Sequence, residues 1–415
     1  MYNAGTCTVY TSFLMTNISG TFNIRVRTEN AGATMLNLYG DYQYEGGSGT
    51  KWFDLESSQA SAFHTINFYG RLLATPGNTD TRLRFGYNNN GTRGHNTVYN
   101  LYGANTFVGR VEFSAGTVVL HNDAALGDSG NFIQVGDSGT GANNIRLYTV
   151  GNRTIAQKVQ LMNGSAARIV GCLDASTVVF NGNLDLMVST GVNQLYAASG
   201  GTVTFNGWVN DGGNNRSIEK TGPGTVILTQ PNNYGNTAVK AGTLLVNNTS
   251  GSGTGQGTVT VESGAKLGGK GRISGTVIVQ SGGTLAPGES VGKLWVNVLN
   301  LNGGSTVEWE KGVGVNTNDV TVVTNLTIGS TVTVKVKPLP GATYDGLGVT
   351  NTVFQVVSSI SGFDNLVLDL SETAGWAGDL VVMEDGLSVG VRLTPEPGVI
   401  GMAVLAGLLA LRKVR

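Results

Sequence analysis

The amino-acid sequence predicts an all-β protein built as a parallel β-solenoid, in which successive coils of the chain stack on one another. Three observations favour this fold class. Gly contributes 63 of the 415 residues, and it alternates with short runs of Thr and Val, a pattern typical of strands joined by tight turns. Strands introduced by Gly-Thr recur along the chain. Between Thr6 and Leu393 almost no 3.6-residue periodicity indicates helices.

The charge balance argues against some classes of partner. With 26 basic and 27 acidic side chains the formal net charge is −1, so nothing steers the whole chain toward nucleic acid or an anionic membrane. We therefore expect no nucleic-acid partner. Cys7 and Cys172 lie far apart and form no Cys-x-x-Cys motif, so neither a metal site nor a cofactor is expected. The sequence leaves two alternatives open: a single disulfide, or two buried free thiols.

Residues 1–104 form a β-rich repeat region that we expect to be continuous with the solenoid. An Asn-(Leu/Phe)-Tyr-Gly tetrapeptide recurs at 37–40, 67–70 and 100–103, in steps of 30 and 33 residues. Repeats at such periods indicate stacked supersecondary units. Steps of this length fit wide coils, and they also fit antiparallel hairpins.

The tyrosines of this repeat are the candidate binding residues. If Tyr39, Tyr69 and Tyr102 recur on one face of stacked coils, they form a ladder suited to stacking on sugar rings. The alternative is that the three rings pack on one another as cross-strand pairs. We treat them as candidate carbohydrate contacts.

Residues 105–330 carry the Gly-Thr strands and form the predicted solenoid. From Gly224 onward these strands follow mostly at intervals of 15 to 25 residues, which matches one coil of about 20 residues. A β-sandwich also uses short strands and Gly-rich turns. The likeness of the strands to one another favours the solenoid, because sandwich strands seldom resemble each other in sequence.

Residues 331–393 differ in composition and are expected to form a β-rich cap. They contain Pro338, Pro340 and Trp376, and they alternate in TVTVKVK and GLSVGVRL. A solenoid needs its last coil covered, because an exposed edge strand invites pairing with another chain.

The stretch 220–308 resembles the autotransporter-associated β-strand repeat. The residues that carry the resemblance are GPGTVIL, NNYGN, KAGTLLV and GGTLAPG. This resemblance covers about a fifth of the chain, and it implies a right-handed parallel β-helix displayed outside a bacterial cell. Classical autotransporters end in a membrane barrel of about 12 strands, for which the residues after Leu393 leave no room. Another export device is therefore expected.

Residues 394–415 resemble a PEP-CTERM sorting signal. Pro395, Glu396 and Pro397 precede an apolar run within 398–411, and Arg412, Lys413 and Arg415 follow it. The resemblance implies that an exosortase, a membrane transpeptidase, cleaves near the Pro-Glu-Pro motif.

Physical properties of this tail agree with the resemblance. The apolar run can lie in lipid as a helix, and the terminal basic residues then stay on the cytoplasmic side. The prolines should leave an extended, accessible peptide before that helix. The run is shorter than the about 20 residues that a full span prefers. The alternative is an ordinary C-terminal helix packed on the cap.

Together these features predict an exported bacterial surface or extracellular-matrix protein with a structural or adhesive role. Its expected partners are the exosortase, exopolysaccharide or other cell-envelope components, and the inner membrane, which it occupies transiently through 398–411. The N-terminus shows no secretory signal, so we expect that the true start lies upstream or that the sequence is incomplete. The alternative function is a secreted carbohydrate-active β-helix enzyme, a polysaccharide lyase or hydrolase.

An enzyme of that kind needs paired carboxylates, or acidic residues clustered around calcium. Asp123, Asp128 and Asp137 lie close together in sequence, but turns explain Asp beside Gly equally well. The three histidines, at positions 64, 95 and 121, lack metal-site spacing. We therefore expect no catalytic and no metal site. Three or more acidic residues converging with Lys or Arg in one groove would favour the enzyme instead.

Overall fold

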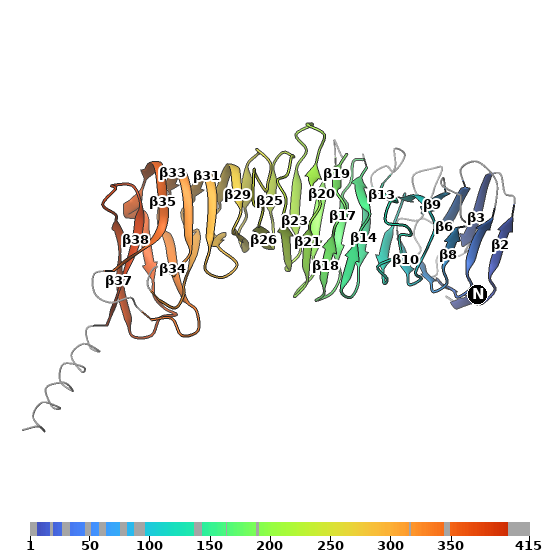
Figure 1. The fold of residues 1–415 in the computed structure, drawn as a ribbon, viewed down its shortest axis with the longest axis horizontal. Helices are drawn as coiled ribbons and strands as arrows, with labels where there is room; N and C mark the ends of the chain where they lie inside the picture. Colours follow the sequence, from blue (N-terminus) through green and yellow to red (C-terminus); the bar gives the residue numbers. More distant parts are fainter. Residues whose placement is uncertain are drawn as a thin grey trace, which may run out of the picture. The chain divides into compact units, whose positions relative to one another are not determined.

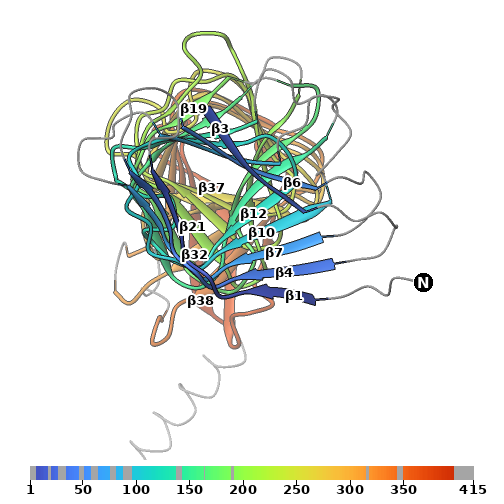
Figure 2. The same ribbon diagram turned by 90° about the vertical axis from the view of Figure 1, so that its right-hand side faces the viewer.

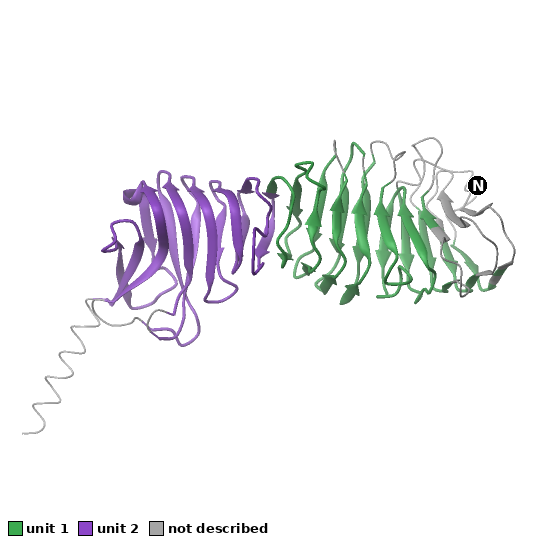
Figure 3. Ribbon diagram, turned by 45° about the horizontal axis from the view of Figure 1, so that its top comes forward, with its two compact units in different colours: residues 1–237 green, residues 238–415 purple. Residues whose placement is uncertain are grey.

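The computed structural model confirms an all-β protein with long parallel sheets, as expected of a β-solenoid. Among the described residues the regular structure is β-strand apart from one 3₁₀ turn, η1 (Phe363–Asn365). The chain divides into two compact units, Met1–Thr237 and Ala238–Arg415 (Figure 3). Strand β25 (Thr237–Val239) contains the point where one unit passes into the other. The structure describes residues 6–16, 20–26, 34–45, 51–57, 64–74, 81–86, 96–136, 143–162, 164–187, 191–314, 317–343 and 349–396.

In the first unit, one parallel sheet is made of the first strand from each coil. Figure 2 shows the N-terminal strands of this sheet side by side. Asn37 pairs with Asn67, and Asn67 pairs with Asn100, so each repeat of the tetrapeptide is one coil. The long step therefore corresponds to wide coils and not to hairpins. The strands of this sheet are β1 (Thr6–Val9), β4 (Thr34–Leu38), β7 (His64–Phe68), β10 (Thr97–Leu101), β12 (Thr117–Leu120), β14 (Ile145–Thr149), β17 (Arg168–Cys172), β20 (Asn193–Ala197) and β23 (Ile218–Thr221).

The remaining strands of this unit complete the coils in further parallel sheets (Figure 1). A short sheet contains β2 (Phe13–Thr16), β5 (Tyr42–Glu45) and β8 (Leu72–Ala74). A second sheet belongs to later coils of this unit and contains β15 (Arg153–Ile155), β18 (Thr177–Phe180), β21 (Thr202–Phe205) and β24 (Thr225–Leu228). A third contains β3 (Gly20–Val26), β6 (Lys51–Ser57), β9 (Thr81–Phe85), β11 (Gly109–Phe113), β13 (Phe132–Val135), β16 (Lys158–Leu161), β19 (Leu184–Leu186) and β22 (Val209–Asn210).

The second unit builds its coils from two parallel sheets. One contains β27 (Val259–Val261), β29 (Arg272–Val279), β31 (Lys293–Leu301), β33 (Val320–Ile328) and β35 (Thr350–Ser361). The other contains β26 (Gly242–Val246), β28 (Ala265–Gly269), β30 (Thr284–Pro287), β32 (Thr306–Lys311), β34 (Val332–Pro338) and β36 (Leu366–Asp369).

The Gly-Thr strands that predicted the coils belong to both of these sheets. Thr284 pairs with Thr306, and Thr306 pairs with Thr333, so these three occupy one position on successive coils. Thr276, which follows Gly275, lies in β29 of the other sheet. The reason is physical: Gly283 precedes β30, whereas Gly275 lies inside β29, where a Cβ would meet the carbonyl oxygen of Gly257 at 1.9 Å. The same Gly-Thr signal therefore marks a strand start in one sheet and a close backbone approach in the other.

The C-terminal part of the second unit changes from parallel to antiparallel pairing. β38 (Val389–Pro395) lies antiparallel between β35 and β37 (Trp376–Val382), while β34 and β36 still pair in parallel. The predicted cap region therefore contains further solenoid strands as well as an antiparallel set that covers β35. Such a cover removes hydrogen-bonding groups from the open edge of a parallel sheet.

Inward side chains form apolar ladders along the coils. Leu38, Phe68, Leu101 and Leu120 follow one another in register and are at most 2% exposed. In the other unit Leu267, Leu285 and Val307 do the same, each fully buried. Alternation of inward apolar and outward polar residues is what period-2 strands produce, and burial of the inward set stabilises the stack.

Two buried lysines hold turns together. Lys220 is fully buried, and its Nζ donates to the carbonyl oxygens of Gly222 and Gly224, both at 2.6 Å. Burial lowers the pKa of Lys220 to about 8. Lys311 is also fully buried, and it donates to the carbonyls of Gly312 and Gly314 at 2.9 and 2.6 Å. Each lysine therefore places its ammonium group among turn carbonyls, two of which belong to the buried Gly224 and Gly312.

Candidate functional site

The predicted tyrosines form a continuous stack in the first unit. The ring centroids of Tyr39 and Tyr69 are 4.4 Å apart, and those of Tyr69 and Tyr102 are 4.5 Å apart. Tyr10 extends the stack beyond Tyr39 at 5.1 Å, and His121 extends it beyond Tyr102 at 4.1 Å. We call these five residues the aromatic ladder. Sequence reasoning found three of its members and missed the two ends, where the tetrapeptide is not repeated.

An amide ladder runs beside the rings. The Nδ2 of Asn67 donates to Asn37 Oδ1, and the Nδ2 of Asn100 donates to Asn67 Oδ1, both at 2.8 Å. His121 Nε2 lies 3.1 Å from Asn100 Oδ1, so its Nε2 carries the hydrogen in this arrangement. Parallel register places identical amides one coil apart, and each amide therefore pairs with the next.

The glycine of the tetrapeptide is required by close contact between coils. A Cβ on Gly40 would lie 2.0 Å from the carbonyl oxygen of Thr11, and a Cβ on Gly70 would lie 2.0 Å from that of Gly40. At Gly103 the corresponding distance to Gly70 is 2.1 Å. No side chain fits at these distances. The tetrapeptide thus supplies an amide link, a core residue, a stacked ring and a close backbone approach in turn.

Stacking determines which part of each ring the ladder presents. Tyr39 and Tyr69 are 44% and 36% exposed, although the face of each ring lies against a neighbour. The rings therefore pack as cross-strand pairs, and what they present to solvent is edges and hydroxyl groups. Burial, followed by the nearby Tyr69 and Tyr10, raises the pKa of Tyr39. Burial, followed by the charge of Arg153, lowers the pKa of His121 and favours a neutral imidazole at pH 7.

Two of the acidic residues singled out as possible catalytic groups have structural partners. Asp128 Oδ1 accepts the backbone N–H of Gly130 at 2.8 Å, which is a turn interaction. Asp123 lies 3.7 Å from Arg153 as an ion pair. Asp137 and His95 lie outside the described residues, and His64 is buried, with a pKa lowered by that burial. Within the described ranges, no group of three or more His, Cys, Asp and Glu side chains is placed to hold a metal ion.

Both cysteines are free thiols. Cys7 is exposed and Cys172 is buried. The structure therefore shows no disulfide, but of the two thiols that the second alternative expected to be buried it buries only Cys172. Burial raises the pKa of the Cys172 thiol, so this residue has the character of an unreactive core side chain.

The start of the predicted sorting signal is partly contained in the cap. Pro395 is buried at the end of β38, opposite Trp376, so it is not the accessible residue that we expected. Glu396 is exposed, and its N–H donates to the carbonyl of Gly375 at 3.0 Å. Pro397, the apolar run 398–411, Arg412, Lys413 and Arg415 lie outside the described residues. In the part of the chain that is described, no helix is long and apolar enough to cross a membrane.

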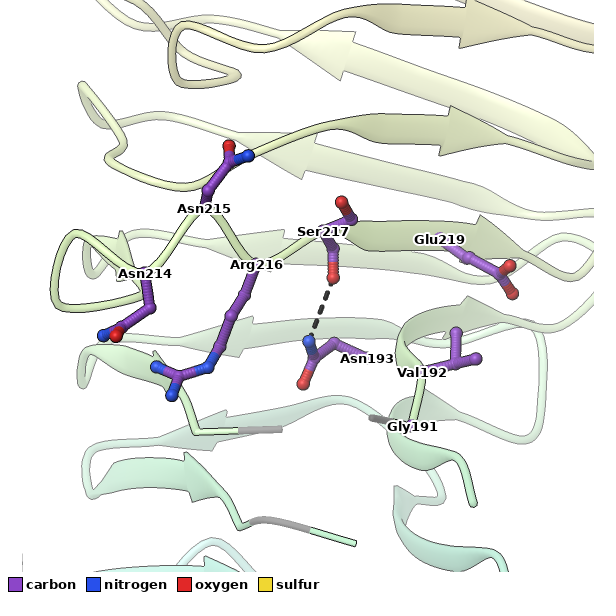
Figure 4. Close-up of a pocket in the computed structure, with 8 residues that line it drawn as sticks. All are labelled: Gly191, Val192, Asn193, Asn214, Asn215, Arg216, Ser217 and Glu219. Carbon is purple, nitrogen blue, oxygen red and sulfur yellow. Dashed lines mark hydrogen bonds between the residues drawn. The ribbon is translucent and has the colours of Figure 1, made fainter. Parts of the chain in front are cut away.

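A polar groove in the first unit was not predicted from the sequence. It has a volume of about 410 Å³ and is formed by two neighbouring coils (Figure 4). The members of its lining that carry polar side chains are Asn193, Asn214, Asn215, Arg216, Ser217 and Glu219. They come from β20, from the turn before β23 and from β23 itself. In a chain so rich in Asn and Gly, nothing in the linear pattern distinguishes these residues, apart from the Asp-Gly-Gly-Asn-Asn turn that precedes Arg216.

The turn that carries Arg216 is held by its own hydrogen bonds. Asp211 is 1% exposed, and its carboxylate accepts the N–H of Gly213 at 2.7 Å and the N–H of Arg216 at 2.6 Å. The guanidinium of Arg216 donates through Nη1 to the carbonyls of Asp211 at 2.8 Å and Leu186 at 2.9 Å. Asn215 adopts a left-handed backbone conformation with φ 55°, which Asn tolerates better than most residues. The groove is thus built from a well-connected turn.

Comparisons with known proteins give one partial similarity. No family model matches the chain. A stretch of 127 residues, 30% of this chain, is 34% identical to a Brucella suis protein described as "Adhesin BmaC autotransporter". The stretch spans 3% of that adhesin, so the chain corresponds to a small part of its length. Part of this chain is therefore similar to part of an autotransporter adhesin, in agreement with the predicted repeat. The sorting signal stays a prediction.

Proposed function

We propose that this is an exported bacterial surface or extracellular-matrix protein with a structural or adhesive role. The observation that carries the proposal is a parallel β-solenoid with partial similarity to an autotransporter adhesin. Stacked coils repeat their outward polar side chains at regular intervals, which suits contact with extended partners.

Surface display can be tested on intact cells of the native host. An antibody raised against residues 96–136 should label intact cells or their extracellular matrix, because these residues would lie outside the cell. A cytoplasmic protein serves as the control and should be labelled only after permeabilisation. If the solenoid is also labelled only after permeabilisation, the proposal is wrong.

We also propose that the C-terminal tail directs sorting. In this scheme the segment 398–411 holds the chain briefly in the inner membrane, and an exosortase cleaves near Pro395-Glu396-Pro397. Because Pro395 is buried in β38, cleavage without unfolding of the cap would have to occur at Glu396 or beyond.

Mass spectrometry of the mature C-terminus tests this scheme. We expect a mature chain that ends shortly after Pro395, and replacement of both Glu396 and Pro397 by Ala should leave the chain unprocessed. Glu384→Ala is the matched control, because Glu384 is an exposed acidic residue of the same cap. A wild-type chain that still ends at Arg415 would contradict the scheme.

Contact with exopolysaccharide is the third part of the proposal, and the aromatic ladder offers one surface for it. Because the ring faces are covered, contact would involve the edges and hydroxyls of the exposed Tyr39 and Tyr69 and of the half-buried Tyr102. Replacing all three by Phe keeps the stacked rings and removes the hydroxyls. Loss of polysaccharide retention would support contact through the hydroxyls, whereas unchanged retention would exclude that contact.

We propose a non-catalytic role in preference to the alternative of a carbohydrate-active enzyme. Two positive observations support this choice. Asp128 holds a turn and Asp123 pairs with Arg153, so both acids already have structural roles. The lining of the polar groove includes one carboxylate, that of Glu219, whereas glycoside hydrolysis normally uses two. Absence of depolymerised product after prolonged incubation with the retained polysaccharide is the expected result.

A further inference from the structure

We propose that the polar groove of the first unit binds a neutral saccharide through pairs of hydroxyl groups. The inference rests on the proposed function and deepens it, because it adds a ligand class and a binding site distinct from the aromatic ladder. Three properties of the groove support it.

The first property is the chemistry of the lining. Small-molecule sites usually have volumes of about 300–1,000 Å³ and mostly apolar walls. This groove, at about 410 Å³, has the volume of such a site but carries amide, guanidinium, hydroxyl and carboxylate groups. Arg216 and Glu219 contribute opposite charges, so the lining favours neither anions nor cations strongly. A ligand rich in hydrogen-bonding groups and without net charge suits such walls.

The second property is a pair of atoms without partners. Asn193 is 2% exposed, and its Nδ2 donates to the carbonyl of Ser217 at 2.9 Å. Figure 4 shows its oxygen on the opposite side, facing the region of the Arg216 guanidinium. Among the described residues, neither Asn193 Oδ1 nor Arg216 Nε has a hydrogen-bond partner. Both atoms are buried, and the oxygen still needs a donor and the N–H an acceptor.

The third property is preorganisation. Arg216 is fixed at Nη1 by two backbone carbonyls, and Asn193 is fixed at Nδ2 by a third. Gln194 Nε2 donates to Glu219 Oε2 at 2.9 Å, which orients that carboxylate. Side chains already held in place lose little conformational entropy when a ligand binds, so even a small polar ligand can bind measurably.

A bound cation would fit this groove less well. The carboxylate oxygens of Asp211 are occupied by backbone N–H groups, and its carbonyl oxygen accepts from Arg216 and from Asn214. The guanidinium therefore already occupies the position in which a metal ion would find oxygen ligands.

Binding by the purified 415-residue protein tests the inference. The protein is applied to an array of neutral gluco-, galacto- and manno-oligosaccharides beside uronate and sialylated glycans, and the strongest ligand is measured by calorimetry. We expect a neutral oligosaccharide to bind saturably. Arg216→Ala and Glu219→Gln should each weaken binding about tenfold or more, because each removes hydrogen bonds that involve a charged group.

Two variants control the experiment. Arg153→Ala removes an arginine that also donates to turn carbonyls, those of Val150 and Asn152, but lies outside the groove, and it should leave affinity unchanged. Glu219→Gln keeps the length of the side chain and an oxygen for Gln194, so it should fold even if Arg216→Ala does not. Binding of uronates alone, stronger binding by Glu219→Gln, or no neutral ligand on the array would each overturn the proposal.

The test separates this inference from the proposed function. If groove variants and wild type bind alike while the protein is labelled on intact cells, the site assignment is wrong and the surface role stands. If the purified protein binds the neutral glycan through the groove but is found only inside cells, the site stands and the surface role is wrong.

Discussion

At the scale of single residues, Gly70 shows how closely the wide coils of the first unit approach each other. A Cβ at this position would lie 2.0 Å from the carbonyl oxygen of Gly40, and backbone atoms cannot move aside as a flexible side chain can. Gly70→Ala should therefore destabilise the protein by about 3 kcal/mol, at the upper end of typical overpacking costs. Thermal unfolding followed by circular dichroism measures the change.

Gly130→Ala is the matched control. Its added Cβ would meet the side-chain oxygen of Asp128 at 3.1 Å, and the residue does not adopt a left-handed conformation. We expect a change below about 1 kcal/mol, because a small movement of one side chain relieves the contact. Equal destabilisation by both substitutions would show that the close approach at Gly70 is not what requires glycine.

Asp319 gives the second unit a pH-dependent stability. It is 1% exposed, and burial, opposed by hydrogen bonds from the N–H groups of Gly292 and Glu310, raises its pKa to about 7. Between about pH 4 and pH 7 the folded state therefore binds a proton that the unfolded state has lost. The contribution of this proton to stability is complete below about pH 4 and is lost as the pH rises through 7.

Asp319→Asn should remove this dependence. The amide does not titrate, so the difference in unfolding free energy between pH 5 and pH 8, on the order of 3 kcal/mol in the wild type, should shrink in the variant. At pH 5 the variant should have a lower free energy of unfolding than the wild type, because its Nδ2 cannot accept a hydrogen bond from one of the two N–H groups. Parallel pH profiles for the two proteins would contradict the assignment of the proton to Asp319.

At the scale of elements, the aromatic ladder links the first strands of successive coils. Tyr69 stacks on two neighbours, Tyr39 and Tyr102, whereas Tyr10 stacks on Tyr39 at one end. Aromatic pairs contribute about 0.5–1.5 kcal/mol each beyond area burial. Tyr69→Leu should therefore cost about 1–3 kcal/mol, and Tyr10→Leu about half as much. Hydrogen exchange of β4, β7 and β10 measures both; equal losses would mean that stacking is not the main contribution of the rings.

The ladder also shows how much of this fold the sequence could predict. Tyr39, Tyr69 and Tyr102 recur with the Asn and Gly that accompany them, because one position on a parallel coil has the same neighbours in every coil. A position can be recognised from the sequence when its residue repeats from coil to coil. His121 occupies the next place in the stack without repeating the tetrapeptide, so sequence comparison could not find it.

The groove could not be predicted for a related reason. Asn193 and Arg216 are brought together by a register of 25 residues between β20 and β23, and the turn that positions Arg216 occurs once. Neither residue type is unusual in this chain. The division of the Gly-Thr strands between two sheets was also hidden, since a Gly-Thr at the start of a strand and one inside a strand look alike in the sequence.

At the scale of the whole molecule, the two compact units raise the question of how far a local change propagates. In a stacked solenoid each coil contacts only its neighbours. The free energy of unfolding is therefore approximately the sum of one contribution from each coil and one from each interface between neighbouring coils. Leu147 in β14 pairs in register with Val118 and Val170, which lie on the two neighbouring coils. Leu285 in β30 pairs in the same way with Leu267 and Val307. All six side chains are fully buried. A cavity at either leucine should therefore be felt first by its own unit.

Leu147→Ala and Leu285→Ala test this reciprocally, and each serves as the control for the other. Each should cost about 2–5 kcal/mol, the usual range for a buried Leu→Ala change. In hydrogen exchange, Leu147→Ala should reduce protection in β12, β14 and β17 and leave β28, β30 and β32 unchanged, while Leu285→Ala should do the opposite. Equal loss in both units from either substitution would show that the chain unfolds as one cooperative structure, because an opening confined to one unit exposes amides in that unit alone.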